Sequence, residues 1–127
     1  MKAIQIAAII SGLSTSAGLA QDIAAGEASF RKCIACHAIG QGAGNKIGPL
    51  LNGIDGRKCG SIGGYSYSAA NRNCTITWNE ADFVTYIKDP KLTIPGTKKL
   101  FSGIKDDIEA KNLWAYVRQF ALDGSMK

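Results

Sequence analysis

The sequence has a single histidine, no run of basic residues, no internal repeat and, beyond its first twenty residues, no long apolar segment. A bilayer-spanning helix needs about 20 apolar residues in a row, so we expect no stable membrane insertion. The lack of repeats, linkers and low-complexity tracts favours one domain. No segment is a convincing strand, which favours an all-α chain.

The charge of the chain is basic but dispersed. Lys and Arg number 15 against 10 Asp and Glu, for a formal net charge of +5. Nucleic-acid binding usually needs a basic cluster or stripe, and the sequence has none. The positive charge instead favours a basic surface that docks on an acidic protein partner. A generally solvated surface is the alternative for any single lysine.

The first twenty residues have the features of a secretory signal peptide. Lys2 supplies the positive start, residues 3–13 are apolar, and the small residues Gly18 and Ala20 suit a signal peptidase. We therefore predict cleavage before Gln21, export to the periplasm and a single mature domain over residues 21–127. A membrane anchor is the alternative, but the apolar run is short and interrupted by Ser and Gly.

The most specific motif is Cys33-Ile34-Ala35-Cys36-His37. The spacing C-x-x-C-H is typical of c-type haem attachment. The two thiols form thioethers with the haem vinyl groups, and the adjacent imidazole binds the iron. Attachment takes place after export, which agrees with the predicted signal peptide. The alternatives are a thioredoxin-like Cys pair and half of a zinc site.

Three helices are expected in the mature chain. The first covers residues 23–35, after Asp22 as its N-cap. The second begins after Asn79, whose side chain can cap it, and ends before Pro90. The third covers about residues 106–121, with acidic residues in its first turn.

A glycine-rich loop over residues 39–64 is unusually long for a compact domain. A loop that wraps a prosthetic group would explain it, because glycine lets the backbone approach a flat ring closely. Gly26 would likewise allow a second helix to approach the first. The side chains expected to face inward are Ala24, Ala28 and Phe30 in the first helix and Ala110, Leu113, Trp114, Val117 and Ala121 in the last.

Further motifs follow the haem-attachment motif in a fixed order. They are Gly48-Pro49-Leu50-Leu51, Gly56-Arg57-Lys58, Tyr65-Ser66-Tyr67, Ala70-Asn71, Trp78, Tyr86-Ile87, Asp89-Pro90 and Ile94-Pro95-Gly96-Thr97-Lys98. With these motifs the chain resembles the class I cytochromes c, above all the mitochondrial type and the short bacterial cytochrome c2 type. The resemblance covers essentially the whole mature chain. It implies an all-α fold of three or more helices, with long loops wrapped around one covalent haem c.

The resemblance also implies roles for single residues. His37 would be the proximal iron ligand, and its other ring nitrogen would donate to the carbonyl of Pro49. One group of residues would hold a haem propionate: Arg57, Tyr67 and Trp78. A second group would line the far side of the ring around an internal water: Asn71, Tyr86 and Thr97. Ordinary packing or turn formation is the alternative for each of these side chains taken alone.

The chain departs from this family at the second axial position. Members normally have Met after Ile-Pro-Gly-Thr-Lys, whereas this sequence has Lys99. The only Met of the mature chain, Met126, lies beyond the last expected helix. Three interpretations remain: Lys99 binds the iron, the site takes water or an outside ligand, or Lys98 turns inward.

Binding through Lys99 would have a chemical consequence. A lysine must lose a proton to bind iron, which costs about 4–5 kcal/mol near pH 6–7 unless burial and the ferric ion lower its pKa. An amine prefers ferric iron, and Met ligation raises the potential of ordinary cytochromes c. The resemblance with Lys99 in place of Met therefore implies a lowered potential.

Cys59 and Cys74 remain after the haem motif is set aside. In an exported protein such a pair suggests a disulfide, here closing a loop of about 15 residues worth about 3 kcal/mol in the chain-entropy model. Two free thiols are the alternative. A four-Cys zinc site is disfavoured, because the spacing lacks a second close pair.

The leading hypothesis is a monomeric periplasmic electron carrier, not an enzyme, with one haem c. The resemblance implies partners with acidic docking surfaces, such as a quinol-oxidising complex, an oxidase or a photosynthetic reaction centre. The basic residues that could surround the haem edge are Arg31, Lys32, Lys46, Lys91 and Lys98. A ligand-binding or sensor haem protein, or a weak peroxidase, is the alternative, although no distal His is present. A thiol oxidoreductase would need a βαβ pattern that the sequence lacks.

Overall fold

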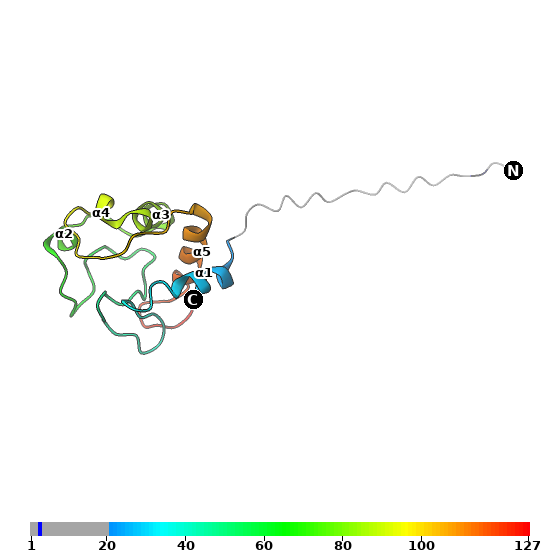
Figure 1. Ribbon diagram of the computed structural model, residues 1–127. Coiled ribbons are helices and arrows are strands. Elements are labelled where there is room, and N and C mark those ends of the chain that lie inside the picture. Colours follow the sequence, from blue (N-terminus) through cyan, green and yellow to red (C-terminus); the bar gives the residue numbers. More distant parts are fainter. Residues whose placement is uncertain (1–2, 4–20) are drawn as a thin grey trace.

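The structure is a computed structural model that describes residue 3 and residues 21–127. The predicted signal peptide, apart from residue 3, lies outside the described residues. Five helices follow one another, as Figure 1 shows: α1 Ile23–Phe30, α2 Ala69–Arg72, α3 Glu80–Lys88, α4 Pro90–Thr93 and α5 Asp107–Val117. The all-α class is confirmed, since the described residues form no strand and only two isolated bridges, Lys58–Thr77 and Phe120–Met126.

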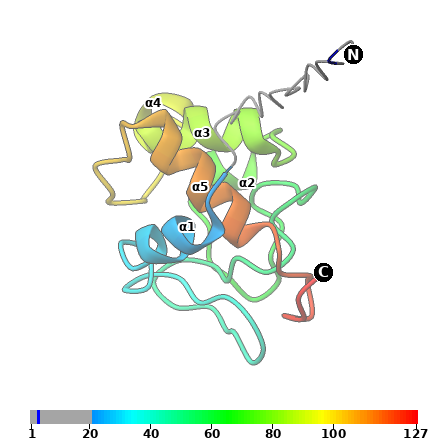
Figure 2. The same cartoon turned by 90° about the vertical axis from the view of Figure 1, so that its right-hand side faces the viewer.

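Helices α1 and α5 cross next to each other near the middle of the molecule (Figure 2). Gly26 makes the close crossing possible, because a Cβ atom at this position would lie 1.9 Å from the carbonyl oxygen of Asn112. The Phe30 and Tyr116 rings pack beside the crossing at 5.5 Å, and Lys32 forms an ion pair with Glu109. The role predicted for Gly26 from the sequence is therefore confirmed.

Helix α3 is positioned by signals at both of its ends. The Asn79 side chain accepts a hydrogen bond from the backbone N–H of Asp82, which confirms the predicted N-cap. Pro90 stops the helix, and it also starts α4 with Asp89 as the N-cap. Phe83 of α3 packs on Trp114 of α5, with ring centroids 5.2 Å apart, so these helices support one side of the core.

Several predicted boundaries and orientations are wrong. Helix α1 ends at Phe30, and residues 31–36 form turns, because the N–H groups of Arg31, Lys32 and Cys33 bond to carbonyls three residues back instead of four. Ala24 and Ala28 are exposed, whereas Gly26 and Phe30 are buried. The short helices α2 and α4 were not expected.

The last helix is also shorter than predicted. It ends at Val117, since the chain turns back at Ala121–Ser125 and pairs Phe120 with Met126. Its predicted inner face is otherwise correct and forms much of the core. Ala110, Leu113, Trp114 and Val117 are buried, and Ala121 is half-buried. In the described part of the chain, residue 3 and residues 21–127, no helix is long and apolar enough to cross a bilayer.

Candidate functional site

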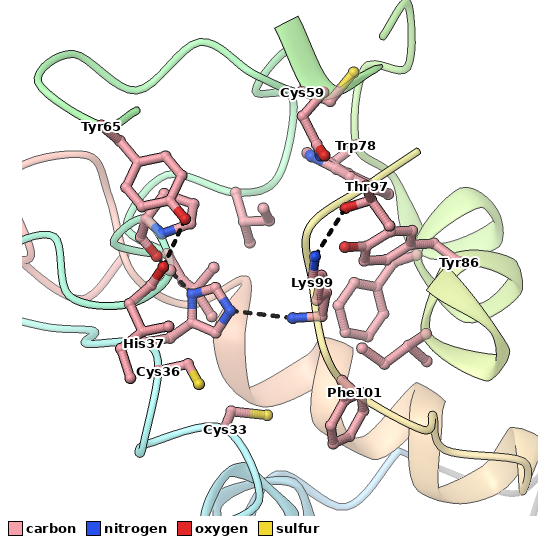
Figure 3. A pocket seen from close by; sticks show the side chains of 18 of the residues that line it. Cys33, Cys36, His37, Cys59, Tyr65, Trp78, Tyr86, Thr97, Lys99 and Phe101 are labelled. Carbon is pink, nitrogen blue, oxygen red and sulfur yellow. Dashed lines mark hydrogen bonds between the residues drawn. The ribbon is translucent and has the colours of Figure 1, made fainter. Parts of the chain in front are cut away.

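A cavity of about 370 Å³ lies between the loops and the helical core. Figure 3 shows that His37 and Lys99 point into it from opposite sides. His37 follows the turn after α1, and Lys99 belongs to the segment between α4 and α5, so the fold brings together residues 62 positions apart. Its apolar lining includes Leu51, Ile54, Trp78, Phe83, Ile87, Phe101, Leu113 and Val117.

His37 is held in one tautomer and one orientation. Its Nδ1–H donates to the carbonyl of Pro49 at 2.6 Å, so the lone pair of Nε2 faces the cavity. The ring needs the glycine at position 48, because a Cβ atom there would lie 2.4 Å from Cε1 of His37. Burial, assisted by the charges of Lys99 and Arg57, lowers the pKa of His37 to about 4. The neutral imidazole is therefore available as a metal ligand at neutral pH.

Lys99 faces His37 directly across the cavity. Its Nζ lies 3.1 Å from Nε2 of His37 and 5.5 Å from the centre of the Phe101 ring. Burial lowers the pKa of the Lys99 amine. The neighbouring Lys98 also borders the cavity, but it is exposed, and its Nζ donates to the carbonyl of Ser66 and lies 4.8 Å over the Tyr65 ring.

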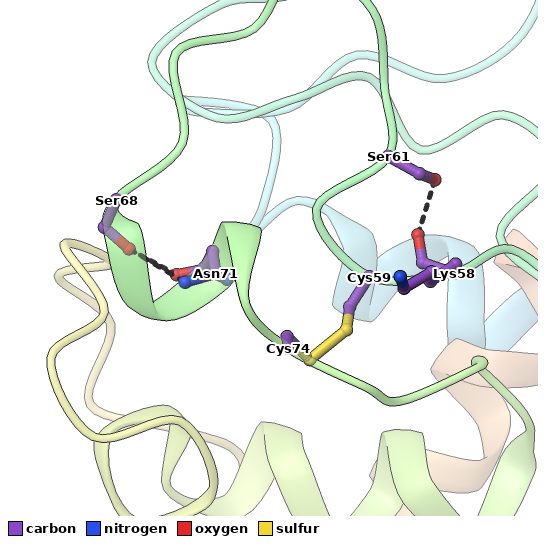
Figure 4. Close-up of a disulfide and its surroundings, with 6 residues drawn as sticks. All are labelled: Lys58, Cys59, Ser61, Ser68, Asn71 and Cys74. Carbon is purple, nitrogen blue, oxygen red and sulfur yellow. Dashed lines mark hydrogen bonds between the residues drawn. A yellow bond between two sulfur atoms is a disulfide. The ribbon is translucent and has the colours of Figure 1, made fainter.

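Cys33 and Cys36 lie at the edge of the cavity below His37, and both are free thiols (Figure 3). Burial raises the pKa of the Cys33 thiol. Cys59 and Cys74 form a disulfide with a Cα–Cα distance of 5.9 Å, which is the pairing expected from the sequence (Figure 4). The two cysteine pairs are therefore separated, and Cys59 also contributes to the cavity wall.

Arg57 provides a half-buried positive charge at the cavity. Its guanidinium donates to the carbonyls of Leu50 at 2.9 Å and Asn52 at 2.8 Å, and burial lowers its pKa. Within residues 21–127 no carboxylate forms an ion pair with this group. An unpaired buried cation can accept an anionic group of a ligand at this point.

The other predicted lining residues also reach the cavity. Tyr67 accepts a hydrogen bond from the N–H of Ile62 at 3.0 Å, and Trp78 packs on Tyr86 at 4.9 Å. Burial raises the pKa of Tyr86, so its hydroxyl stays protonated. Asn71 accepts from the Ser68 hydroxyl at 2.9 Å (Figure 4). Thr97 Oγ1 accepts a long hydrogen bond from the backbone N–H of Lys99.

Sequence analysis assigned no role to two residues that matter here. Tyr65 lines the cavity, and its hydroxyl donates to the carbonyl of Ile47 at 2.6 Å. Phe101 lines the cavity beside Lys99. Both are aromatic residues in segments without helix or strand, and Tyr65 also stands in the Tyr65-Ser66-Tyr67 motif, which could have marked it.

The residues around the cavity suit a flat, largely apolar group that carries a metal and an acidic edge. Apolar side chains form most of the wall, two nitrogen donors face each other, and two thiols are available at the rim. Arg57 lies at the wall as the matching cation. A haem c attached through Cys33 and Cys36 fits each of these features.

Comparisons with known proteins agree with this chemistry. Cytochrome c2 from Rhodoplanes tepidamans is 59% identical over 107 residues, which cover 84% of this chain and 100% of that protein. Cytochrome c2 from Blastochloris viridis is 48% identical over 127 residues, 100% of both chains. The solved structure of cytochrome c2 from Rhodospirillum centenum has a TM-score of 0.73 at 33% identity, covering 79% of this chain and 98% of that one. No protein-family model matches.

Proposed function

The chain belongs to the class I cytochrome c family, and we propose that it is a periplasmic carrier whose haem iron is bound by His37 and Lys99. As in its relatives, one haem c is attached covalently through the Cys pair, and the protein is an electron carrier rather than an enzyme. The haem supplies a metal that accepts and returns one electron without bonding to a substrate. The polypeptide excludes water, holds the iron ligands and presents a docking surface.

The opposed nitrogen atoms of His37 and Lys99 carry this proposal. Because Nδ1 of His37 donates to Pro49, Nε2 is the nitrogen left to bind a metal, and in this structure it lies 3.1 Å from the Lys99 amine. On the other side, the Lys99 amine is turned inward and has a lowered pKa, which favours the neutral form that iron requires. A solvated surface lysine would show neither property.

The arrangement supports Lys99 over the two alternatives for the sixth position. Lys98 is occupied on the outer surface by the carbonyl of Ser66 and the ring of Tyr65. A site open to water or an outside ligand would need Lys99 to leave the cavity, where its amine lies 5.5 Å from the centre of the Phe101 ring. We therefore assign Lys99 as the sixth ligand.

His37 and Lys99 as ligands imply a lowered reduction potential, because a neutral amine stabilises ferric iron more than a thioether does. Axial ligands and their surroundings tune haem potentials over about 0.8 V. The carrier would thus suit a low-potential donor better than its Met-ligated relatives. Its partners would be acidic redox proteins, such as a quinol-oxidising complex, an oxidase or a reaction centre, that dock on the basic residues near the cavity.

The proposed location depends on the first twenty residues, which would act as the signal peptide and be removed before Gln21. The alignment with the Blastochloris viridis protein includes these residues, so a leader of the same length is compatible with that relative. Mass spectrometry of the periplasmic fraction tests the location, and a mature chain that begins elsewhere would contradict the cleavage site.

The decisive experiment on ligation replaces Lys99 by Met in the holoprotein. We expect the midpoint potential to rise by a substantial part of the range that axial ligands span, and the ferric spectrum to gain the Met–iron charge-transfer band. Lys91→Met is the matched control, because Lys91 lies on the exposed side of α4. An unchanged potential would exclude Lys99 as the ligand. Rapid binding of cyanide by the unmodified ferric protein at neutral pH would instead favour the ligand-binding alternative.

A further inference from the structure

One wall of the cavity is formed by a segment that we call the strap, residues 60–73. The disulfide Cys59–Cys74 closes its base (Figure 4). Next to the disulfide, the N–H of Cys59 bonds to the carbonyl of Ile76 at 2.8 Å, and the N–H of Trp78 bonds to the carbonyl of Arg57 at 2.9 Å. The strap thus leaves the core and returns to it through one narrow neck.

The strap has almost no apolar anchor of its own. None of residues 60–77 is fully buried, and helix α2 within it buries no side chain. At the neck, a Cβ atom on Gly60 would lie 2.2 Å from the carbonyl oxygen of Asn71, so the two arms are in close contact there. The position of the strap therefore depends on its covalent neck and on a few polar contacts further out.

Those outer contacts join the strap to both loops that flank the cavity. On the His37 side, Tyr65 donates to the carbonyl of Ile47, and Asn45 donates to the carbonyl of Gly63 at 3.1 Å. On the Lys99 side, the Lys98 amine donates to the carbonyl of Ser66 and lies over the Tyr65 ring. Tyr65 thus takes part in both connections.

Lys98 and Lys99 have the same chemistry and adjacent positions, so their directions decide which amine faces His37. We propose that the disulfide-closed strap selects Lys99 as the iron ligand by holding Lys98 on the outer surface through Ser66 and Tyr65. Tyr65 and the Cys59–Cys74 disulfide are positioning residues in this scheme, because they act through Lys98 and not on the iron. The inference rests on the proposed ligation by Lys99.

The test uses ferric holoprotein with Lys99→Ala, studied by EPR and optical spectroscopy at one fixed pH. With the strap intact, we expect loss of the low-spin, nitrogen-ligated signal, because Lys98 cannot reach the iron. Adding Cys59→Ser, Cys74→Ser and Tyr65→Leu should release Lys98. The low-spin amine-ligated fraction should then rise at least about thirtyfold above any such fraction left with the strap intact, the ratio expected from losing one charged hydrogen bond and one cation–π contact. A further Lys98→Ala change should abolish it.

Two matched controls separate selection from general loosening of the fold. Tyr65→Phe keeps the ring beneath Lys98 and removes only the hydroxyl bonded to Ile47, so it should release Lys98 less than Tyr65→Leu does. Lys91→Ala, at an exposed lysine of the same region, should leave the restored signal unchanged. If the Cys variants do not fold, the disulfide of folded Lys99→Ala protein can be reduced and its two thiols alkylated. The haem is then reoxidised before the spectra are recorded.

Two results would overturn the inference. The first is a Lys98-dependent low-spin signal already present in Lys99→Ala protein with its disulfide intact. The second is the lack of any such signal after the strap is released. Failure of the proposed ligation looks different: the low-spin spectrum of the unmodified protein would persist in both Lys99→Ala and the double variant with Lys98→Ala. Another residue would then bind the iron, and selection between the two lysines would be excluded as well.

Discussion

His37 and Lys99 face the same cavity, but the two sides that carry them are built differently. On the His37 side, the ring is bonded to Pro49, packed against Gly48 and placed next to two cysteines that attach the haem. On the Lys99 side, the segment before α5 has no helix or strand, and its neighbour Leu100 is 88% exposed. The His37 side is thus determined by short-range geometry, whereas the Lys99 side depends on side-chain contacts with distant segments.

This difference explains how the second proposed ligand can change without loss of the fold. The core made by α1, α3 and α5 packs through residues such as Phe30, Phe83 and Trp114. Position 99 is not one of the residues of this core. A new side chain at this position changes the chemistry of the iron while the helices stay in place. The comparison of the two sides can be tested at five points.

The largest effect is expected on the His37 side, from Gly48→Ala. The added methyl group would meet a ring that Pro49 holds in place, so His37 must leave its position. We expect a loss of about 4 kcal/mol in the free energy of unfolding, together with a low yield of holoprotein. Gly44→Ala is the control, because a Cβ atom at Gly44 meets nothing within 4 Å. Normal yield and stability would show that the His37 side is not rigid.

The second largest effect is the loss of stability of the haem-free protein in acid, which His37 should cause. The unfolded chain binds a proton at His37 near pH 6.5, and the folded protein does so only near about 4. Between these values the unfolded state holds more protons, so the free energy of unfolding decreases as the pH falls, by about 3 kcal/mol from this group. Denaturant titrations of the haem-free protein at several pH values measure the slope, because Nε2 of His37 would be bound to iron in the holoprotein.

As the pH falls, the two proposed ligands should leave the iron one after the other. A lysine amine is ordinarily a much stronger base than an imidazole, although burial lowers the pKa of Lys99. Protonation should therefore remove the Lys99 amine from the iron at a higher pH than it removes His37. Optical spectra during the titration should change in two steps. A single step would mean that both ligands leave the iron at the same pH, which would contradict the difference between the two sides.

A smaller effect is expected on the Lys99 side, from Gly96→Ala. Gly96 has a φ of +87°, and a Cβ atom there would lie 3.3 Å from the Cβ of Ala70 in α2. The strained backbone should cost about 1 kcal/mol in unfolding free energy, well below the loss expected for Gly48→Ala. Thermal unfolding of the two variants in parallel gives the comparison. Equal losses would contradict the difference between the sides.

The smallest effect concerns the helix crossing, where Glu109→Gln removes the ion pair with Lys32. Both groups are at least partly exposed, so the pair should contribute only about 0.5 kcal/mol. The change should leave the potential and the ferric spectrum unaltered. A decrease of more than about 2 kcal/mol in the free energy of unfolding would show that this pair also holds the haem-attachment turn in place.

The haem-attachment motif on the His37 side and the bounds of α3 could be predicted from the sequence, because their signals are local. The C-x-x-C-H spacing, the cap at Asn79 and the stop at Pro90 act within one or two helical turns. The end of α1 could not be predicted, since it depends on a change to hydrogen bonds three residues back at Arg31, Lys32 and Cys33. Helices α2 and α4 have only four residues each, too few for a periodic pattern to be visible.

The sequence by itself determined which chemical groups the protein has: two thiols and an imidazole in one motif, two adjacent lysines after Ile-Pro-Gly-Thr, and a second pair of cysteines. Only the tertiary structure decided which of two adjacent lysines faces His37. That outcome depends on the contacts of Lys98 with Ser66 and Tyr65, more than thirty residues away along the chain. Such contacts leave no local pattern, because folding brings their partners together only after the loops have closed.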